Sequence, residues 1–174
     1  MAIYSGFPSD GSKDYDGYST TNTYLMASAN EDGVTKSYGE AILNTSEVVG
    51  KIITAATLTF WNQTVVNAGS LVTTIHLYNQ STGQFDIHAY SRAAGPANHR
   101  YVTTALTSSA QLSAINGSGG TETAVRFSVN TPPSLNNEWR VNAYESGSTV
   151  CTRIGVRYDE PIATAARRRP FIIT

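Results

Sequence analysis

The sequence has one cysteine, Cys151, among 174 residues, so no disulfide can form within the chain, and a plain structural thiol is expected. Charged residues make up only 14% of the chain, and the formal net charge is -1. Such a chain has no overall attraction to nucleic acid or to an anionic membrane, and neither is expected as a partner. No apolar run approaches the length of a membrane-spanning helix. A chain of this length can nevertheless bury a sizeable core without metals or disulfides.

The first eight residues, MAIYSGFP, contain neither a basic segment nor an apolar stretch. No secretory signal is therefore expected. The sequence favours synthesis in a cytoplasm, and a protein that works outside the cell would leave by lysis or within a larger assembly.

Sequence signatures of common catalytic sites are also missing. The chain has no G-x-S-x-G elbow, no phosphate-binding G-K-[ST] loop, no dinucleotide fingerprint and no H-E-x-x-H motif. The acids that a glycoside hydrolase would need lie on separate segments: Glu40, Asp86, Glu122 and Glu138. We therefore expect no enzyme, no catalytic residue and no cofactor. A polysaccharide-acting enzyme is the weakest alternative.

What the sequence has is alternation of apolar and polar residues with a period of two, which predicts β-strands. It is clearest in six segments: 56–61, 72–78, 85–90, 125–129, 139–143 and 150–158. Turn residues separate them, and Pro170–Thr174 reads as a terminal strand. We predict one domain over residues 1–174, an all-β antiparallel sandwich that is jelly-roll-like, with about nine or ten strands. At most one short helix is expected, near Ser108–Ile115, and residues 1–13 are expected to form an extended N-terminal arm.

Two histidines are expected to face each other. If Val72–Tyr78 and Phe85–Tyr90 form a hairpin, matching their apolar faces places His76 near His88 on the opposite face. Two imidazoles can begin a metal site, but His99 lies in a separate loop and no third ligand is evident. Ordinary surface or second-sheet histidines are favoured, and no metal site is predicted. Asp14 and Asp16 are the acids that a calcium ion would use, although such pairs are common in turns.

Three aromatic residues are candidates for ligand binding. Tyr78 and Tyr90 are expected on the same face as the histidines, together with Trp61 if its strand is a neighbour. Aromatic rings beside polar side chains suit sugars, whose C–H faces stack on them. The same rings could instead fill the core or a subunit interface.

Arg167, Arg168 and Arg169 form the strongest charge cluster. They read either as a solvated linker before the last strand or as a contact with an acidic partner surface. We assign them to partner binding, because guanidinium groups suit carboxylates on a neighbouring subunit.

Nearly the whole chain resembles one family. Asp16-Gly17-Tyr18 is followed by the segments Gly39–Leu43 and Gly50–Trp61, and the chain closes on Arg153–Tyr158 and Arg169–Thr174. This order is similar to the DNRLRE-type jelly-roll domains, which look like carbohydrate-binding modules and occur in surface proteins and in phage structural proteins. The matching residues are those that a strand needs for packing, so they carry over no binding role.

The resemblance implies a non-enzymatic accessory structural protein of a tailed phage virion: a decoration protein, spike or fibre subunit on the head or tail. Its expected partners are other virion proteins of the capsid or tail, further copies of itself, and a host glycan. Its expected location is the virion. The alternative is a stand-alone carbohydrate-binding module, which would be monomeric and bind sugars through exposed aromatic residues.

Overall fold

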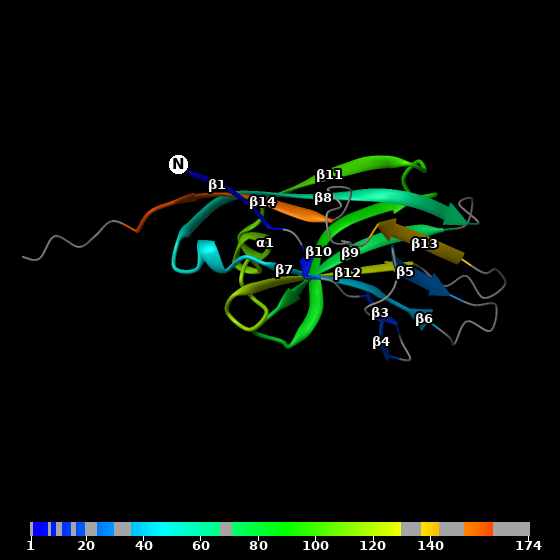
Figure 1. The fold of residues 1–174 in the computed structure, drawn as a ribbon, viewed down its shortest axis with the longest axis horizontal. Helices are drawn as coiled ribbons and strands as arrows, with labels where there is room; N and C mark the ends of the chain where they lie inside the picture. The colour runs from blue at the N-terminus through cyan, green and yellow to red at the C-terminus, as the bar shows by residue number, and fades with distance from the viewer. Residues whose placement is uncertain are drawn as a thin grey trace, which may run out of the picture.

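The computed structural model describes residues 2–6, 8–9, 12–14, 17–19, 24–29, 36–66, 71–129, 137–142 and 152–161. They form two antiparallel sheets packed face to face, with a small two-stranded sheet beside them. The chain is therefore an all-β sandwich, and the predicted fold class is confirmed (Figure 1).

The first sheet, sheet A, is built around one long strand. Its order is β1-β14-β8-β13-β5-β6, and β11 pairs with the other edge of β8. Its strands are β1 (Ala2–Gly6), β5 (Tyr24–Ala29), β6 (Lys36–Ser37), β8 (Ile52–Val66), β11 (Arg100–Leu106), β13 (Asn137–Asn142) and β14 (Arg153–Asp159). Strand β8 has 15 residues, so it spans about 50 Å at roughly 3.3 Å per residue. One of its edges pairs with β14 and then with β13, and Figure 1 shows it running along much of the molecule.

The second sheet, sheet B, has the order β10-β9-β12-β7-β2. Its strands are β2 (Pro8–Ser9), β7 (Gly39–Asn44), β9 (Val72–Asn79), β10 (Gln84–Ala93) and β12 (Glu122–Val129). The small sheet pairs β3 (Ser12–Asp14) with β4 (Gly17–Ser19). From β7 to β13 the chain crosses repeatedly between sheets A and B, which is the connectivity of a jelly-roll-like sandwich.

Helical structure is brief in the described part of the chain. The helix α1 (Ser109–Ser113) begins at a capping box, in which the Ser108 side chain accepts from the Gln111 backbone and the Gln111 side chain accepts from the Ser108 backbone. A 3-10 turn, η1 (Ser46–Val48), precedes β8. The short helix expected near Ser108–Ile115 is thus confirmed. None of the helices in these ranges is long and apolar enough to cross a membrane.

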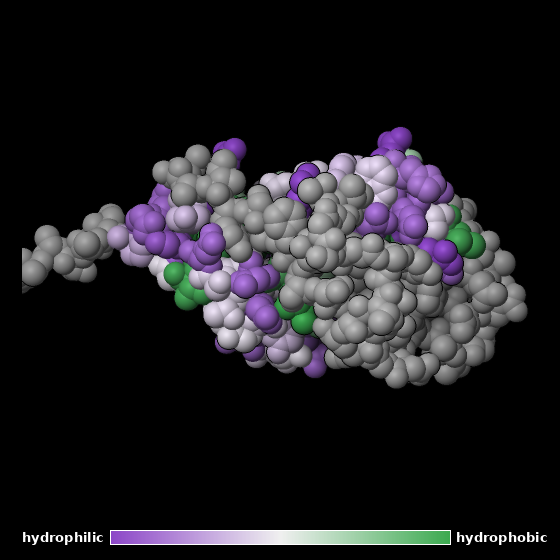
Figure 2. Space-filling model, in the orientation of Figure 1, coloured by the Kyte–Doolittle hydropathy of each residue, from purple (hydrophilic) through white to green (hydrophobic). Residues whose placement is uncertain are grey.

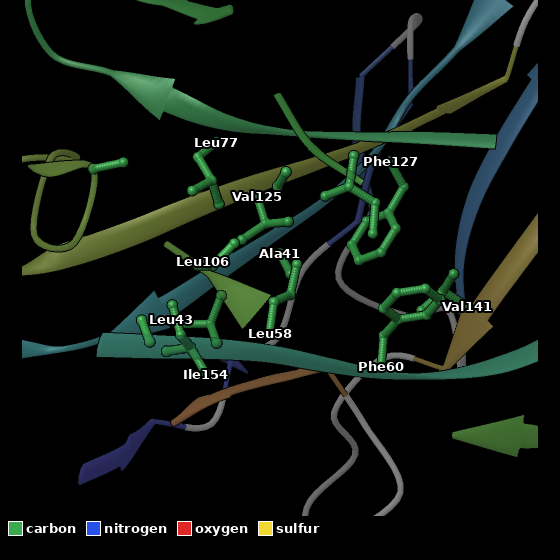
Figure 3. Packing of buried hydrophobic residues seen from close by; sticks show 14 of the residues in the cluster. Ala41, Leu43, Leu58, Phe60, Leu77, Leu106, Val125, Phe127, Val141 and Ile154 are labelled. Carbon is green, nitrogen blue, oxygen red and sulfur yellow. The ribbon is translucent and has the colours of Figure 1, made fainter. Parts of the chain in front are cut away.

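The core lies between the two sheets, where the inward side chains of β8, β13 and β14 meet those of β7, β9 and β12 (Figure 3). At its centre, Phe60 packs edge to face on Tyr90, Phe127 and Trp139, with ring centroids 5.5, 5.7 and 5.6 Å away. The indole N–H of Trp139 donates to the Oδ1 of buried Asn62 at 2.7 Å. The Asn62 amide in turn donates to the carbonyls of residues 96 and 97, so both its nitrogen and its oxygen have hydrogen-bond partners.

The N-terminal segment lies along the sandwich. Strand β1 pairs with β14 in sheet A, and β2 pairs with β7 in sheet B, so each of these short strands lies at an edge of its sheet. The chain forms more strands than the nine or ten expected, because β2, β3, β4 and β6 have only two or three residues each. Such segments are too short to show alternation. The predicted terminal strand 170–174 lies outside the described residues.

Candidate functional site

The outward side chains of β8, β11 and β14 form one continuous surface, here called outer face A. Because Ala56, Leu58 and Phe60 point into the core, the residues between them point out. The strand register places three rows on this face: Trp61 beside Tyr101, then Arg153–Thr59–Thr103, then Gly155–Thr57–Ala105, with Arg157 and Ala55 beyond.

Aromatic rings form one end of outer face A. The rings of Trp61 and Tyr101 meet edge to face, with centroids 4.9 Å apart. The Arg153 guanidinium lies over the Tyr101 ring, 5.2 Å from its centroid, which is cation–π geometry. In the next row the hydroxyls of Thr59 and Thr103 are hydrogen-bonded at 3.1 Å. The result is an aromatic and hydroxyl-bearing surface beside a positive charge.

A hollow of about 380 Å³ lies toward the opposite end of the face from these aromatic rings. It is lined by Ala55, Ala56, Thr57, Ala105, Leu106, Thr107, Gly155 and Arg157. Its floor is open because Gly155 has no side chain and its neighbours across the strands are Thr57 and Ala105. A Cβ added at Gly155 would meet no heavy atom closer than the Thr57 carbonyl oxygen at 4.0 Å. Small side chains at these register positions therefore leave the hollow open.

The two arginines of outer face A are not neutralised by carboxylates in the part of the chain that the structure describes. The ion pairs found there are Lys51–Glu160, Arg126–Glu40 and Arg140–Glu138. Arg153 and Arg157 are in none of them. They lie four residues apart on β14, about 13 Å, on either side of Gly155. Outer face A thus offers two guanidinium groups to a ligand.

The opposite surface, outer face B, is formed by the outward side chains of β7, β9, β10 and β12. Here the arginine is fully engaged: the Arg126 guanidinium lies 2.7 Å from the Glu40 carboxylate. It also lies over the Phe85 and Tyr38 rings, 4.0 and 4.9 Å from their centroids. The ring of Tyr78 packs on Phe85 at 5.4 Å. The charged groups and aromatic rings of this face are therefore engaged in ion-pair, cation–π and ring contacts with one another.

The predicted histidine pair is present on outer face B. His76 and His88 are register partners of β9 and β10, and their ring centroids are 5.7 Å apart. The pKa of His76 is lowered mainly by burial, and further by the positive charges of His88 and Arg126, while Asp86 opposes the shift. No group of three or more metal-ligating side chains occurs among the residues with described positions.

Asp86 lies at a bulge in β10, next to Phe85. The Thr82 hydroxyl donates to its carboxylate at 2.7 Å. Hydrogen bonds from Thr82 and then Asn79 lower the pKa of Asp86, because they favour the ionised form. A carboxyl held in this way is a poor proton donor.

The three aromatic residues predicted to bind a ligand do not share one surface. Trp61 lies on outer face A, because β8 belongs to the other sheet, and Tyr78 lies on outer face B. Tyr90 packs against Phe60 in the core, and burial raises its pKa. Two bulges in β10, between residues 85 and 87 and between 88 and 90, shift its alternation, so Tyr90 pairs with Ile75 and turns inward. The expectation of a common face is thereby corrected, and the ligand-binding roles stay predictions.

Other residues singled out from the sequence lie outside the described ranges: Cys151, Asp16, Arg167, Arg168 and Arg169. Sequence reasoning in turn missed Tyr101, Arg153, Gly155 and Arg157. They come together only through the pairing of β8 with both β11 and β14, which no local pattern indicates. The alternation of Arg153–Tyr158 could have shown that Arg153, Gly155 and Arg157 share a face. Comparison with models of protein families and with curated proteins finds no match for this chain.

Proposed function

We propose that this chain is a non-enzymatic accessory structural protein of a tailed phage virion, which docks to other virion proteins through its ends. One observation supports docking through the ends of the molecule. Four large apolar side chains are strongly exposed among the described residues, and three of them lie at the ends of β8: Val49, Ile52 and Val66. Isolated apolar residues on a surface need no explanation, but their concentration at the two ends of a long strand favours end-on contacts.

The end that carries Val49 and Ile52 includes a turn joined to a neighbouring strand. The turn between η1 and β8 contains Gly50 with φ of +75°, a conformation that favours glycine. Lys51 forms a salt bridge of 2.5 Å with Glu160, which ties this turn to the end of β14. The two apolar side chains, 48% and 53% exposed, therefore flank a turn that is linked to the end of β14.

The coloured part of the face in Figure 2 is suited to contact with solvent. In the view of Figure 2 the coloured surface is mostly hydrophilic or neutral, and hydrophobic residues show only as small separate patches. An elongated sandwich with apolar side chains exposed at the ends of its longest strand suits a decoration protein, spike or fibre subunit. The resemblance to phage structural domains supports the virion over other assemblies, and Arg167–Arg169 stay assigned to partner binding on their charge alone.

The test is incorporation into particles. We expect peptides of the wild-type chain in purified virions. Ile52→Asp, alone and combined with Val49→Asp, should keep the far-ultraviolet circular dichroism spectrum and lower incorporation at least tenfold, because a charge would be buried in the contact. Ser91→Asp adds the same charge to an exposed position on β10 and should incorporate normally. Absence of the wild type from particles would refute the virion proposal, and normal incorporation of the double variant would refute docking through this end.

A second function, a stand-alone carbohydrate-binding module, is favoured by the aromatic and hydroxyl-bearing surface of outer face A. The two functions differ in association: a free module is monomeric, while a virion protein binds a capsid or tail partner or further copies of itself. Analytical ultracentrifugation of the purified chain, together with the particle assay, distinguishes them.

A further inference from the structure

Outer face A has the composition of a binding site for a negatively charged ligand. Arg153 and Arg157 stand on either side of a hollow floored by Gly155, Thr57 and Ala105. Neither arginine is in an ion pair with a described residue. Asp159, two residues beyond Arg157, marks the far limit of this positive strip. The local charge is therefore complementary to carboxylates, although the whole chain is slightly negative.

The neutral groups around the arginines narrow the chemistry of the ligand. Thr57 and Thr107 line the hollow, Thr59 and Thr103 lie in the next row, and each hydroxyl can both donate and accept a hydrogen bond. Trp61 and Tyr101 supply aromatic surface at one end. A guanidinium for a carboxylate, hydroxyls for hydroxyls and rings for C–H faces together match a sugar acid.

The dimensions indicate a short chain of sugars. A hollow of about 380 Å³ falls within the range of small-ligand sites. The Cα atoms of the two arginines are about 13 Å apart along β14, which is longer than one monosaccharide. Two carboxylates on different sugar units of one oligosaccharide can therefore bind the two guanidinium groups at the same time.

We propose that outer face A binds an acidic oligosaccharide, with carboxylates at Arg153 and Arg157 and a sugar ring over the hollow at Gly155. This assignment deepens the binding role proposed above by naming the class of glycan. It does not depend on docking through Val49 and Ile52, which lie outside the hollow. The two proposals can therefore fail separately.

The test is calorimetric titration of the full chain with three acidic probes: oligogalacturonate, oligomannuronate and oligosialic acid. Methyl-esterified oligogalacturonate and dextran oligomers are the neutral controls. At least one acidic probe should bind, its affinity should fall as salt is raised, and esterification should lower the affinity tenfold or more. Absence of binding by all three acidic probes, or equal binding of the ester, would overturn the proposal.

Variants locate the site. Arg153→Gln and Arg157→Gln should each weaken binding about tenfold, because each removes a charge-assisted hydrogen-bond donor. Arg92→Gln, an exposed arginine of β10, is the matched control and should leave the affinity unchanged. Gly155→Val should abolish binding by filling the hollow, and it should fold normally because a Cβ there has room and valine favours strands.

Other outcomes would contradict the ligand class or its place. If a glutamate oligomer of matched length binds as tightly as the acidic sugars, the face recognises acidic protein instead. If Gly155→Val folds normally and retains full affinity, the sugar lies elsewhere. Either result leaves the particle-incorporation experiment unaffected, so a failure here is distinguishable from a failure of the virion proposal.

Discussion

Outer faces A and B contain the same kinds of side chain but arrange them differently. On face B, Arg126 is paired with Glu40 and stacked between two aromatic rings. On face A, Arg153 and Arg157 form no ion pair with a described residue, and Gly155 leaves a hollow between them. Composition alone therefore does not identify a binding face. What distinguishes face A is that its two arginines form no ion pair with a described residue and lie next to an unfilled hollow.

Both faces rest on one core, and removing its centre should have the largest effect. Phe60→Ala takes away a ring that contacts Tyr90, Phe127 and Trp139, and it leaves a cavity between the sheets. We expect a loss of about 3–5 kcal/mol in the free energy of unfolding, measured by urea denaturation. Thr59→Ala, at the adjacent outward position, should cost about 1 kcal/mol or less. Equal losses for the two variants would contradict the inward and outward assignment of β8.

Removing the buried amide of Asn62, beneath face A, should have the second-largest effect on the free energy of unfolding. Asn62→Ala leaves the Trp139 indole N–H and two backbone carbonyls without their partner. We expect a loss of about 3 kcal/mol in unfolding free energy. Asn98→Ala is the matched control, because its side chain accepts from the Val65 backbone at an exposed site, and it should cost about 1 kcal/mol or less. If Asn62→Ala loses no more unfolding free energy than Asn98→Ala, the buried hydrogen bonds of Asn62 do not contribute as described.

A double-mutant cycle sharpens the contrast between the faces. Glu40→Gln and Arg126→Gln, made singly and together, should give a coupling energy of about 1 kcal/mol, because both side chains are largely buried. Arg157→Gln should change the unfolding free energy by less than about 0.5 kcal/mol, since it breaks no ion pair with a described residue. The contrast between a paired arginine on face B and one on face A that forms no ion pair with a described residue would be contradicted by either of two results. These are a coupling energy near zero for Glu40 and Arg126, or a large loss of unfolding free energy in Arg157→Gln.

The smallest effect should be the pH dependence that His76 gives to face B. Its pKa is lowered in the folded protein by burial and by positive neighbours, so the unfolded chain binds a proton more readily. Stability should be full above pH 6.5, the ordinary pKa, and should decline as the pH falls below it, levelling off below the folded-state pKa. Replacing His76 by Gln should flatten this decline in urea denaturation series. His99→Gln, in an exposed loop, should not.

Local patterns in the sequence predicted local structure well. The one short helix expected near Ser108–Ile115 is α1, and the capping box at Ser108 explains where it begins. The alternation of β9 and β10 placed His76 opposite His88, because a hairpin joins strands that are neighbours in sequence. Bulges in β10 defeated the same reasoning at Tyr90, since an inserted residue reverses the alternation without a clear sequence signal.

Pairing between distant strands was not predictable from these patterns. Face A exists because β8 lies between β11 and β14, which are far from it in sequence. Alternation shows which residues of one strand share a face, but it does not show which strand lies beside it. For this reason Trp61 was associated with Tyr78, and its true neighbour, Tyr101, was not considered.

The central claim is that face A binds a ligand, whereas the charged and aromatic side chains of face B interact with one another. The most direct test is a titration of the ¹⁵N-labelled protein with the acidic oligosaccharide that binds tightest, followed by amide chemical shifts. The account predicts that the largest changes fall on β8, β11 and β14, at Thr57, Thr103, Gly155 and Arg157, while His76, Phe85 and Arg126 stay unchanged. Changes centred on β9, β10 and β12, or no changes at saturating oligosaccharide, would contradict it.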